Sequence, residues 1–143
     1  PTVAVVLAHR GALEQMEIPG VPAFNPMMLL HGEEKVDFFN PIENDSTLVC
    51  TESVHDIQDK KKATLLIIET EIKDKASGQL KAKIYTNLFV RGLEGSKNKG
   101  KFANPIPEAP KRTPCFSKSE TTTPNQAFYY RLCGDRNPLH VDP

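Results

Sequence analysis

The chain has 143 residues, and its 18 Lys and Arg residues balance 18 Asp and Glu residues to a formal net charge of +0. This is the length of one domain that can bury a sizeable core without disulfide bonds. The neutral balance argues against a nucleic-acid-binding protein, which relies on a basic surface, and no apolar run approaches the roughly 20 residues of a membrane-spanning helix.

The cysteines indicate reduced thiols in an intracellular compartment. Cys50, Cys115 and Cys133 are widely spaced and form no CxxC arrangement, so the sequence predicts neither a disulfide framework nor a zinc site. We therefore expect a soluble protein whose partners are small molecules or other subunits.

The first 26 residues hold a short apolar stretch followed by three prolines. Any regular element there is brief, and its type stays open. The chain starts with Pro1 instead of Met and stops after Pro143, which indicates a fragment of a longer protein.

Residues 27–93 are dominated by β-branched and apolar residues that alternate with polar ones. The alternation before and after the segment Lys75–Gly78 predicts two strands joined by a hairpin turn near Ser77–Gly78. We expect one antiparallel sheet of at least three or four strands. The following residues 93–119 contain a polar lysine-rich run and four prolines, which is typical of a connection and not of a core.

A helix is predicted near the end of the chain. Thr123 stands at an N-cap position, Pro124 at the first helical position and Gln126 three residues after the cap, which is a capping-box arrangement. Gly134 stands where a left-handed residue ends a helix. We therefore expect the helix to begin at Pro124 and to end before Gly134.

A tight polar turn is predicted directly after this helix. Pro138 restricts Asn137 to an extended conformation, and Leu139 and Val141 resume an apolar alternation in which His140 points the other way. On this backbone the side chains of Asp135, Asn137 and His140 can converge.

The chemistry of these three side chains fits acid–base catalysis. An aspartate can act as a base and a histidine can carry a proton, while an asparagine amide orients a ligand without titrating. The alternative from spacing alone is a capped helix end with polar decoration. A metal site made of Asp135, His140 and Asp142 is a further alternative, but no companion ligand pair at familiar spacing supports it.

The segment NQAFYYRLCGDRNPLHVDP resembles the signature of the (R)-specific 2-enoyl-CoA hydratases, the hydratase 2 or MaoC-like family. The upstream segment LLHGEEKVDFFNPI is similar to the hydratase unit of peroxisomal multifunctional enzymes of type 2. The resemblance implies an α+β hot-dog fold, in which a curved antiparallel sheet wraps a helix.

The resemblance also implies a division of the chain. Residues 1–92 would form a degenerate amino-terminal hot-dog repeat, residues 93–119 an inter-repeat connection, and residues 120–143 the beginning of the catalytic repeat. The long central helix and the glycine amide that binds the thioester oxygen in this family are then expected beyond Pro143.

The function implied is hydration of trans-2-enoyl-CoA to (3R)-3-hydroxyacyl-CoA in fatty acid β-oxidation, without a metal or organic cofactor. Asp135 and His140 would activate one water, and Asn137 would fix its position. The family match also implies substrate contacts at His31, Gly32, Lys60, Arg136, Pro138 and Leu139. Of these, Arg136 departs from the aromatic residue expected in the closest animal relatives.

The remaining expectations concern partners, location and alternatives. The resemblance implies an acyl-CoA thioester substrate, a homodimer or pairing with a second hot-dog repeat, and a peroxisomal location. One alternative is a non-catalytic acyl-CoA binding module, and another is a dehydratase that acts on 3-hydroxyacyl thioesters. A thioesterase should lack the Asp-x-Asn-x-x-His spacing of this sequence.

Overall fold

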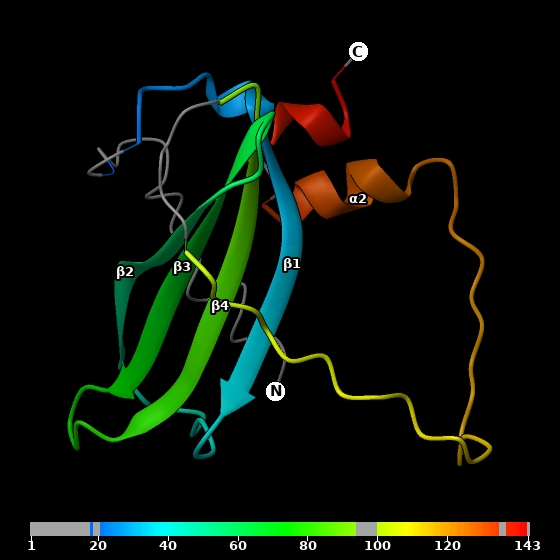
Figure 1. Ribbon diagram of the computed structural model, residues 1–143. Coiled ribbons are helices and arrows are strands. Elements are labelled where there is room, and N and C mark those ends of the chain that lie inside the picture. The colour runs from blue at the N-terminus through cyan, green and yellow to red at the C-terminus, as the bar shows by residue number, and fades with distance from the viewer. Residues whose placement is uncertain (1–17, 19–20, 94–99, 135–136, 143) are drawn as a thin grey trace. The chain divides into compact units, whose positions relative to one another are not determined.

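The computed structural model describes residue 18 and residues 21–93, 100–134 and 137–142. The elements in chain order are the 3-10 helix η2 (Pro26–Met28), the strands β1 (Leu29–Phe38), β2 (Leu48–Asp59), β3 (Ala63–Asp74) and β4 (Leu80–Arg91), the helix α2 (Gln126–Leu132) and the 3-10 helix η3 (Pro138–His140), as Figure 1 shows. Among the described residues, no helix is long and apolar enough to cross a membrane.

The chain divides into two compact units, residues 1–104 and residues 105–143. The division falls inside the predicted connection 93–119, and the predicted domain boundaries at 92 and 119 stay a prediction. Most of the segment 1–26, whose type the sequence left open, lies outside the described residues.

The described residues of the first unit form a four-stranded sheet with the order β1-β4-β3-β2, in which all neighbours are antiparallel. The predicted antiparallel sheet is therefore confirmed, with four strands. The predicted hairpin turn at Ser77–Gly78 is also confirmed, because it joins β3 to β4. Gly78 has a φ of 71°, a conformation that glycine adopts without steric cost, and the Asp74 carboxylate accepts a hydrogen bond from the Ser77 backbone nitrogen at 2.7 Å.

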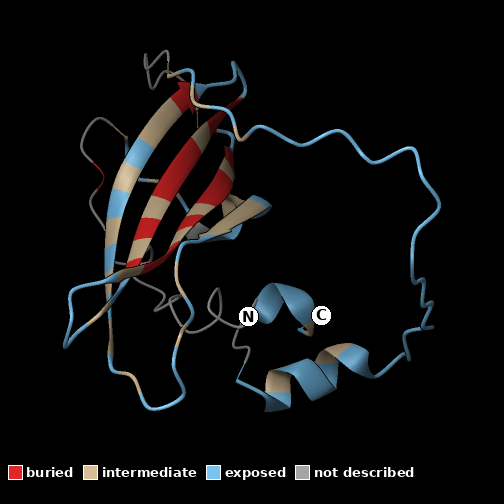
Figure 2. Cartoon of the chain, turned by 90° about the horizontal axis from the view of Figure 1, so that it is seen from below, coloured by how far each residue is buried: buried red, intermediate tan, exposed pale blue. Residues whose placement is uncertain are grey.

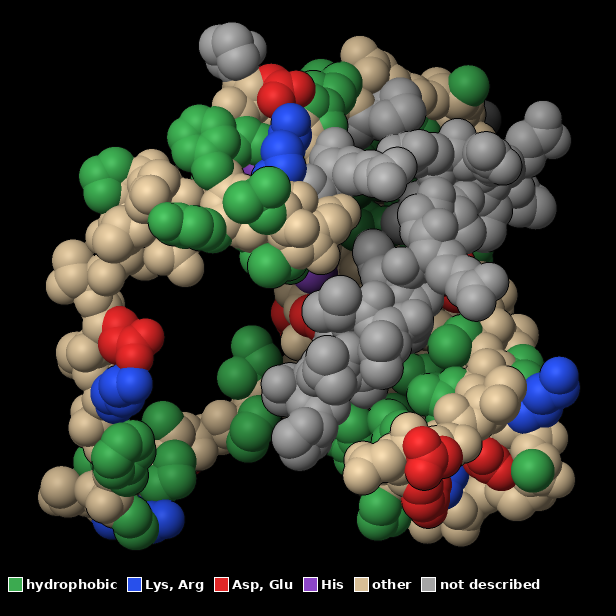
Figure 3. Space-filling view, turned by 180° about the vertical axis from the view of Figure 1, so that it is seen from behind, with side chains coloured by type: hydrophobic (Ala, Val, Ile, Leu, Met, Phe, Trp, Pro, Cys, Tyr) green, Lys and Arg blue, Asp and Glu red, His purple; other side chains and the backbone are tan. Residues whose placement is uncertain are grey.

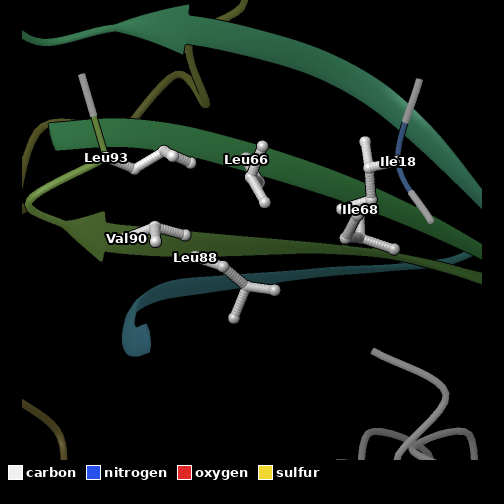
Figure 4. Close-up of a cluster of buried hydrophobic side chains, with 6 residues drawn as sticks. All are labelled: Ile18, Leu66, Ile68, Leu88, Val90 and Leu93. Atoms are coloured by element: carbon white, nitrogen blue, oxygen red, sulfur yellow. The ribbon is translucent and has the colours of Figure 1, made fainter. Parts of the chain in front are cut away.

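Alternation along β3 and β4 gives the sheet two different faces. The apolar face carries the buried residues Leu66, Ile68, Leu88 and Val90, which cluster with Ile18 and Leu93 (Figure 4). A second cluster of Ile72, Ala82 and Ile84 extends this face toward the hairpin turn. Figure 2 shows that the buried positions lie mainly on the two central strands, β3 and β4, while many positions of the outer strands β1 and β2 are exposed.

The opposite face, here the charged face, carries Glu69, Glu71, Lys83 and Tyr85. Lys83 Nζ lies 3.1 Å from Glu69 and 2.8 Å from Glu71. Hydrogen bonds from Lys73 and Lys83 lower the pKa of Glu71 to about 2. Burial and a hydrogen bond with Glu69 raise the pKa of Tyr85. These cross-strand contacts fix the register of β3 and β4 from the side opposite the core.

A β-bulge interrupts the pairing of β2 with β3 between Val54 and Asp56 and leaves His55 as the extra residue. The His55 ring lies edge-on to Phe102, with the ring centroids 4.3 Å apart. The Asp56 carboxylate accepts hydrogen bonds from the backbone nitrogens of Ile57 and Phe102 at 2.9 and 2.8 Å. The first residues described after position 99 are thus bound to the edge of β2 and belong to the first unit.

Candidate active site

Helix α2 begins at Gln126, two residues later than the sequence predicts. The N-cap residue is Asn125, which forms no side-chain capping bond. The hydroxyl of Thr123 lies 2.8 Å from Asn125 Oδ1, so it is not used on the helix backbone. The predicted capping box with its start at Pro124 is therefore wrong, because a local side-chain pair competes for the Thr123 hydroxyl.

The carboxyl end of α2 agrees with the prediction. Cys133 is the C-cap residue, and Gly134 has a φ of 114°, where side chains other than hydrogen are strained. The chain therefore turns sharply at Gly134, immediately before the polar motif.

The turn after Gly134 is built around Asn137. Asn137 has a φ of −67° and a ψ of 114°, which is the extended conformation predicted from the proline that follows. Its Oδ1 accepts a hydrogen bond from the Leu139 backbone nitrogen at 3.0 Å, and this bond caps the 3-10 helix Pro138–His140. The predicted extended alternation of Leu139 and Val141 is wrong, because the capped proline turn winds these residues into a helical turn.

This turn brings two of the three candidate side chains together. Asn137 Nδ2 lies 3.4 Å from His140 Nε2, and both side chains are exposed. Asp135 and Arg136 lie outside the described residues. The predicted arrangement of Asp135, Asn137 and His140, the substrate contact at Arg136 and the alternative metal set that includes Asp135 are therefore not tested by the structure.

Arg131 is a site residue that the sequence interpretation missed. From the last turn of α2, its Nη1 lies 2.9 Å from Asp142 Oδ1 and its Nη2 donates to the Asn137 carbonyl oxygen at 3.2 Å. One guanidinium thus holds both ends of the capped turn against the helix. Only the folded turn brings these residues into reach, so no local sequence pattern marks the pair.

Helix α2 exposes a large apolar surface. The exposed fractions are 58% for Phe128, 60% for Tyr129 and 82% for Leu132, and Figure 3 shows hydrophobic side chains open on this surface. Pro138 and Leu139 are also exposed, so they are accessible to a ligand, and their predicted substrate contacts stay a prediction.

His31 lies on the edge strand β1 and is held by a polar chain. His31 Nε2 lies 2.8 Å from Glu34 Oε2, and the hydroxyl of the buried Thr86 donates to Glu34 Oε1 at 3.2 Å. The imidazole is 55% exposed and stands beside the apolar face, since His31 is paired with Leu88. Glu34 and Thr86 were missed because their contact joins distant parts of the sequence.

Gly32 is the extra residue of a β-bulge in β1, between His31 and Glu33. A side-chain carbon at Gly32 would meet the Asn87 backbone oxygen at 3.5 Å, an ordinary contact. The glycine is therefore not required by packing within the sheet. Glycine is common in β-bulges, and the predicted substrate contact at Gly32 stays a prediction.

Lys60 lies in the tight turn between β2 and β3. Its backbone nitrogen donates to the Ala63 carbonyl oxygen at 2.9 Å. The pairings of Leu88 with His31 and of Leu88 with Leu66 show that Lys60 and His31 lie at the same end of the sheet. Alternation along β2 assigns Lys60 to the charged face, whereas His31 stands at the apolar face.

One open hollow of about 470 Å³ lies at the other end of the sheet, beside the β3–β4 turn. Its lining includes Glu43, Asp74, Ser77 and Lys81, and none of the predicted site residues. The described residues contain no group of three His, Cys, Asp or Glu side chains that can hold a metal ion.

Comparison with known proteins adds a family model. The model of the MFE-2 hydratase 2 N-terminal domain matches residues 1–92. The peroxisomal enoyl-CoA hydratase 2 of Arabidopsis thaliana is 34% identical over an alignment of 155 residues, which covers 100% of this chain and 49% of the relative. The 3-hydroxyacyl-thioester dehydratase Y of Mycobacterium tuberculosis is 38% identical over 125 residues, which cover 86% of this chain and 43% of the relative.

A solved structure agrees with these sequence relatives. The MaoC-like dehydratase from Phytophthora capsici aligns with a TM-score of 0.72 and 38% identity, over 90% of this chain and 43% of that one. This likeness confirms the predicted α+β hot-dog fold. The chain spans 49%, 43% and 43% of the lengths of these three proteins.

Proposed function

Because the chain belongs to the family of MFE-2 hydratase 2 N-terminal domains, we propose that it forms part of an (R)-specific 2-enoyl-CoA hydratase. The reaction adds water to trans-2-enoyl-CoA and yields (3R)-3-hydroxyacyl-CoA in fatty acid β-oxidation. The relative named enoyl-CoA hydratase 2 supports this activity over the whole length of the chain. The observation that carries the proposal at the site is the Asn137–His140 pair on a capped turn.

In the proposed mechanism, Asp135 and His140 bind one water and remove a proton from it. The water oxygen forms the new bond to Cβ, and the π electrons of the double bond move toward Cα and the thioester oxygen. The removed proton then returns to Cα through the same pair of residues. All atoms of the water enter the product, and the reaction uses no metal or organic cofactor.

The described residues support this mechanism by positioning. The two polar atoms of the Asn137 side chain make different contacts. Oδ1 accepts the hydrogen bond from the Leu139 backbone nitrogen, and Nδ2 faces His140. Arg131 holds the Asn137 carbonyl from helix α2. A water bound between rigid groups reacts faster than a mobile one because its orientation is already fixed.

The proposed substrate is an acyl-CoA thioester. We assign substrate contacts to His31, Gly32 and Lys60, which lie at one end of the sheet, and among them Lys60 is the residue that would meet the phosphates of CoA. Contacts beside the reacting carbons are assigned to Arg136, Pro138 and Leu139. The names of relatives support a peroxisomal location, and the exposed surface of α2 fits pairing with a second hot-dog repeat or a second subunit.

A second candidate function is dehydration of 3-hydroxyacyl thioesters. It is favoured by the relative named 3-hydroxyacyl-thioester dehydratase Y. Dehydration is the reverse of the same chemistry, so the same residues serve both directions. The two candidates differ in the thioester that the enzyme prefers, and comparing CoA with carrier-protein thioesters separates them.

The test is hydration of crotonyl-CoA and of a longer trans-2-enoyl-CoA by the full-length protein, with chiral analysis of the product. We expect the (3R) alcohol, and we expect His140→Ala to lower turnover by about a hundred-fold or more, the scale of losing a positioned acid or base. Lys111→Ala, an exposed change in the second unit, is the matched control. Near wild-type turnover in a folded His140→Ala protein would mean that the polar motif only caps the end of a helix and has no catalytic role.

A further inference from the structure

Four exposed cationic side chains lie at one end of the sheet. Lys60, Lys61 and Lys62 form the turn between β2 and β3, and Arg91 is the last residue of β4. The turn and the strand end are hydrogen-bonded, because the Gly92 backbone nitrogen donates to the Lys62 carbonyl oxygen at 3.1 Å. The four cations, here called the basic end, therefore lie on two backbone segments that are hydrogen-bonded to each other.

The register brings two of these cations onto one face. Ala63 is paired with Arg91, and Lys60 is hydrogen-bonded to Ala63. Alternation along the strands therefore assigns Lys60 and Arg91 to the charged face, on either side of a small buried alanine. Their Cα atoms are two strand spacings apart, about 10 Å, and both side chains are long enough to reach one ligand between them.

The basic end differs from the rest of the sheet in its lack of ion pairs. Four other sheet lysines each lie within 3.1 Å of a carboxylate oxygen: Lys35, Lys73, Lys81 and Lys83. The ion pairs of the described residues include none of the basic end. Like charges at this spacing repel one another, and an anionic ligand would relieve that repulsion.

The turn itself is held in an unusual conformation. Lys61 has a φ of 69°, in the left-handed region that a lysine rarely adopts. A hydrogen bond from the Lys61 backbone nitrogen to the Asp59 carboxylate, 2.8 Å long, holds it there. Unfavourable backbone conformations persist at ligand-binding turns, and here the effect is to display consecutive lysines at the rim of the sheet.

We propose that Arg91 binds the phosphate groups of the nucleotide part of coenzyme A together with Lys60, and that it determines a preference for CoA thioesters over carriers that lack these phosphates. The proposal rests on the proposed function, since it names the part of the substrate that this end of the sheet recognises. Arginine suits the role because its planar guanidinium binds two phosphate oxygens at once.

The size of the basic end favours CoA over an acidic carrier protein. A stable protein partner covers about 800 Å² on each side of an interface, whereas the basic end comprises four side chains around one turn. A nucleotide with a diphosphate and a 3′-phosphate places several negative charges within that small area. A carrier protein would require further contacts along the charged face, where the lysines of β4 are already paired.

The experiment compares full-length wild-type protein, Arg91→Ala, Arg91→Lys and Lys75→Ala. Lys75 is an exposed lysine in the turn at the other end of the sheet and serves as the matched control. Steady-state kinetics use the same trans-2-enoyl group on CoA, on 3′-dephospho-CoA, on pantetheine and on acyl-carrier protein. We expect Arg91→Ala to raise KM for the CoA thioester about two- to five-fold, the scale of one solvated charged contact, with kcat unchanged.

The same variant should leave KM for the pantetheine thioester unchanged, and Arg91→Lys should recover part of the affinity for CoA. An equal rise in KM for the CoA and pantetheine thioesters would show that Arg91 has only a structural role. A rise in KM for the carrier-protein thioester alone would mean that Arg91 contacts a carrier protein and not the nucleotide of CoA. No rise for the CoA thioester would overturn the proposal.

Calorimetric titration with CoA separates this proposal from the proposed function. If wild-type protein hydrates no enoyl thioester but binds CoA more tightly than Arg91→Ala does, CoA binding by Arg91 is supported and the proposed hydratase function is contradicted. If the protein hydrates enoyl thioesters and Arg91→Ala binds CoA as tightly as wild type does, the hydratase function is supported and the role of Arg91 is contradicted.

Discussion

The backbone nitrogen of Phe102 donates a hydrogen bond to Oδ2 of Asp56 across 2.8 Å, and this bond fastens residues 100–102 to the bulged end of β2. Burial of Asp56 opposes its charge, but hydrogen bonds from Gln58, Phe102 and Ile57 outweigh burial and lower the pKa of the Asp56 carboxyl below its ordinary value of 3.8. The folded state therefore favours the ionised carboxylate.

The first prediction is a dependence of stability on pH. Because the pKa of Asp56 is lower in the folded state, its contribution is complete well above pH 3.8 and is lost as pH falls through the folded value. Asp56→Asn should lower the free energy of unfolding by about 1 to 2 kcal/mol at pH 7, since hydrogen bonds to a charged acceptor are lost. Urea unfolding from pH 7 down to pH 3 should show that the difference in free energy of unfolding between wild type and Asp56→Asn becomes smaller below pH 3.8. A difference that stays constant over this range would contradict the role of the Asp56 charge.

The second prediction concerns Gly100, whose backbone nitrogen donates to the Ile57 carbonyl oxygen at 3.2 Å. A side-chain carbon at this glycine would overlap the Asp56 carboxylate. Gly100→Ala should therefore destabilise the protein by about 1 to 3 kcal/mol, the range for overpacking. Gly32→Ala, whose new carbon makes only an ordinary contact, is the control in the same thermal unfolding assay. Equal stability of the two variants would mean that residues 100–102 are not bound to β2 in solution.

The third prediction tests Arg131 as a positioning residue. Arg131→Ala removes the contacts to Asp142 and to the Asn137 carbonyl, so the turn that carries His140 should become less ordered. We expect kcat for trans-2-enoyl-CoA to fall about ten-fold with little change in KM, because misplacement of a reacting group slows the chemical step.

Arg131→Lys, which retains one charged contact, should recover part of the turnover. Arg112→Ala, an exposed arginine of the same unit, should behave as wild type. A rise in KM without a fall in kcat would assign Arg131 to substrate binding instead.

The fourth prediction addresses the proposed water-activating pair. Asp135→Ala and His140→Ala should each reduce turnover by about a hundred-fold or more, and the double variant should be little worse than either, as for groups that act on one water. Asn137→Ala should cost less and leave the pH dependence of the rate nearly unchanged, since an amide does not titrate. Circular dichroism must accompany this variant, because Asn137 also caps the turn. Fully multiplicative losses in the double variant would mean that the two residues act separately.

The fifth prediction concerns the exposed surface of α2. Phe128, Tyr129, Tyr130 and Leu132 are all more than half exposed, and apolar surface of this kind associates in water. The polypeptide of residues 1–143 alone should therefore self-associate with rising concentration. Sedimentation equilibrium that shows a monomer throughout would contradict this expectation.

The sheet was predictable from the sequence because its signal is local. Alternating residues such as Ile68, Thr70 and Ile72 determine a strand and its buried face, and Ser77–Gly78 marks the turn to the next one. The place of β1 beside β4 was not predictable. It depends on pairs such as Val36 with Ile84, which join segments far apart in the chain and leave no periodic pattern.

The site was predictable to a smaller extent. The extended Asn137 and the positive φ of Gly134 follow from the intrinsic conformational limits of residues before proline and of glycine. The start of α2 did not follow from its capping pattern, because Thr123 bonds to Asn125 instead. Arg131 and Glu34 were missed because their partners become neighbours only in the folded chain, and the role of Asp135 stays a prediction.

The order of the strands has a consequence for how the first unit assembles. β2, β3 and β4 follow one another through short turns, so they can form by local hairpin closure, whereas β1 must wait for β4, the last of the four described strands. Closing that long loop costs chain entropy before any pairing is gained. Amide hydrogens of β1 should accordingly exchange with solvent sooner than those of β3, so that the strand carrying His31 and Gly32 can detach from the sheet while the three-stranded meander stays folded.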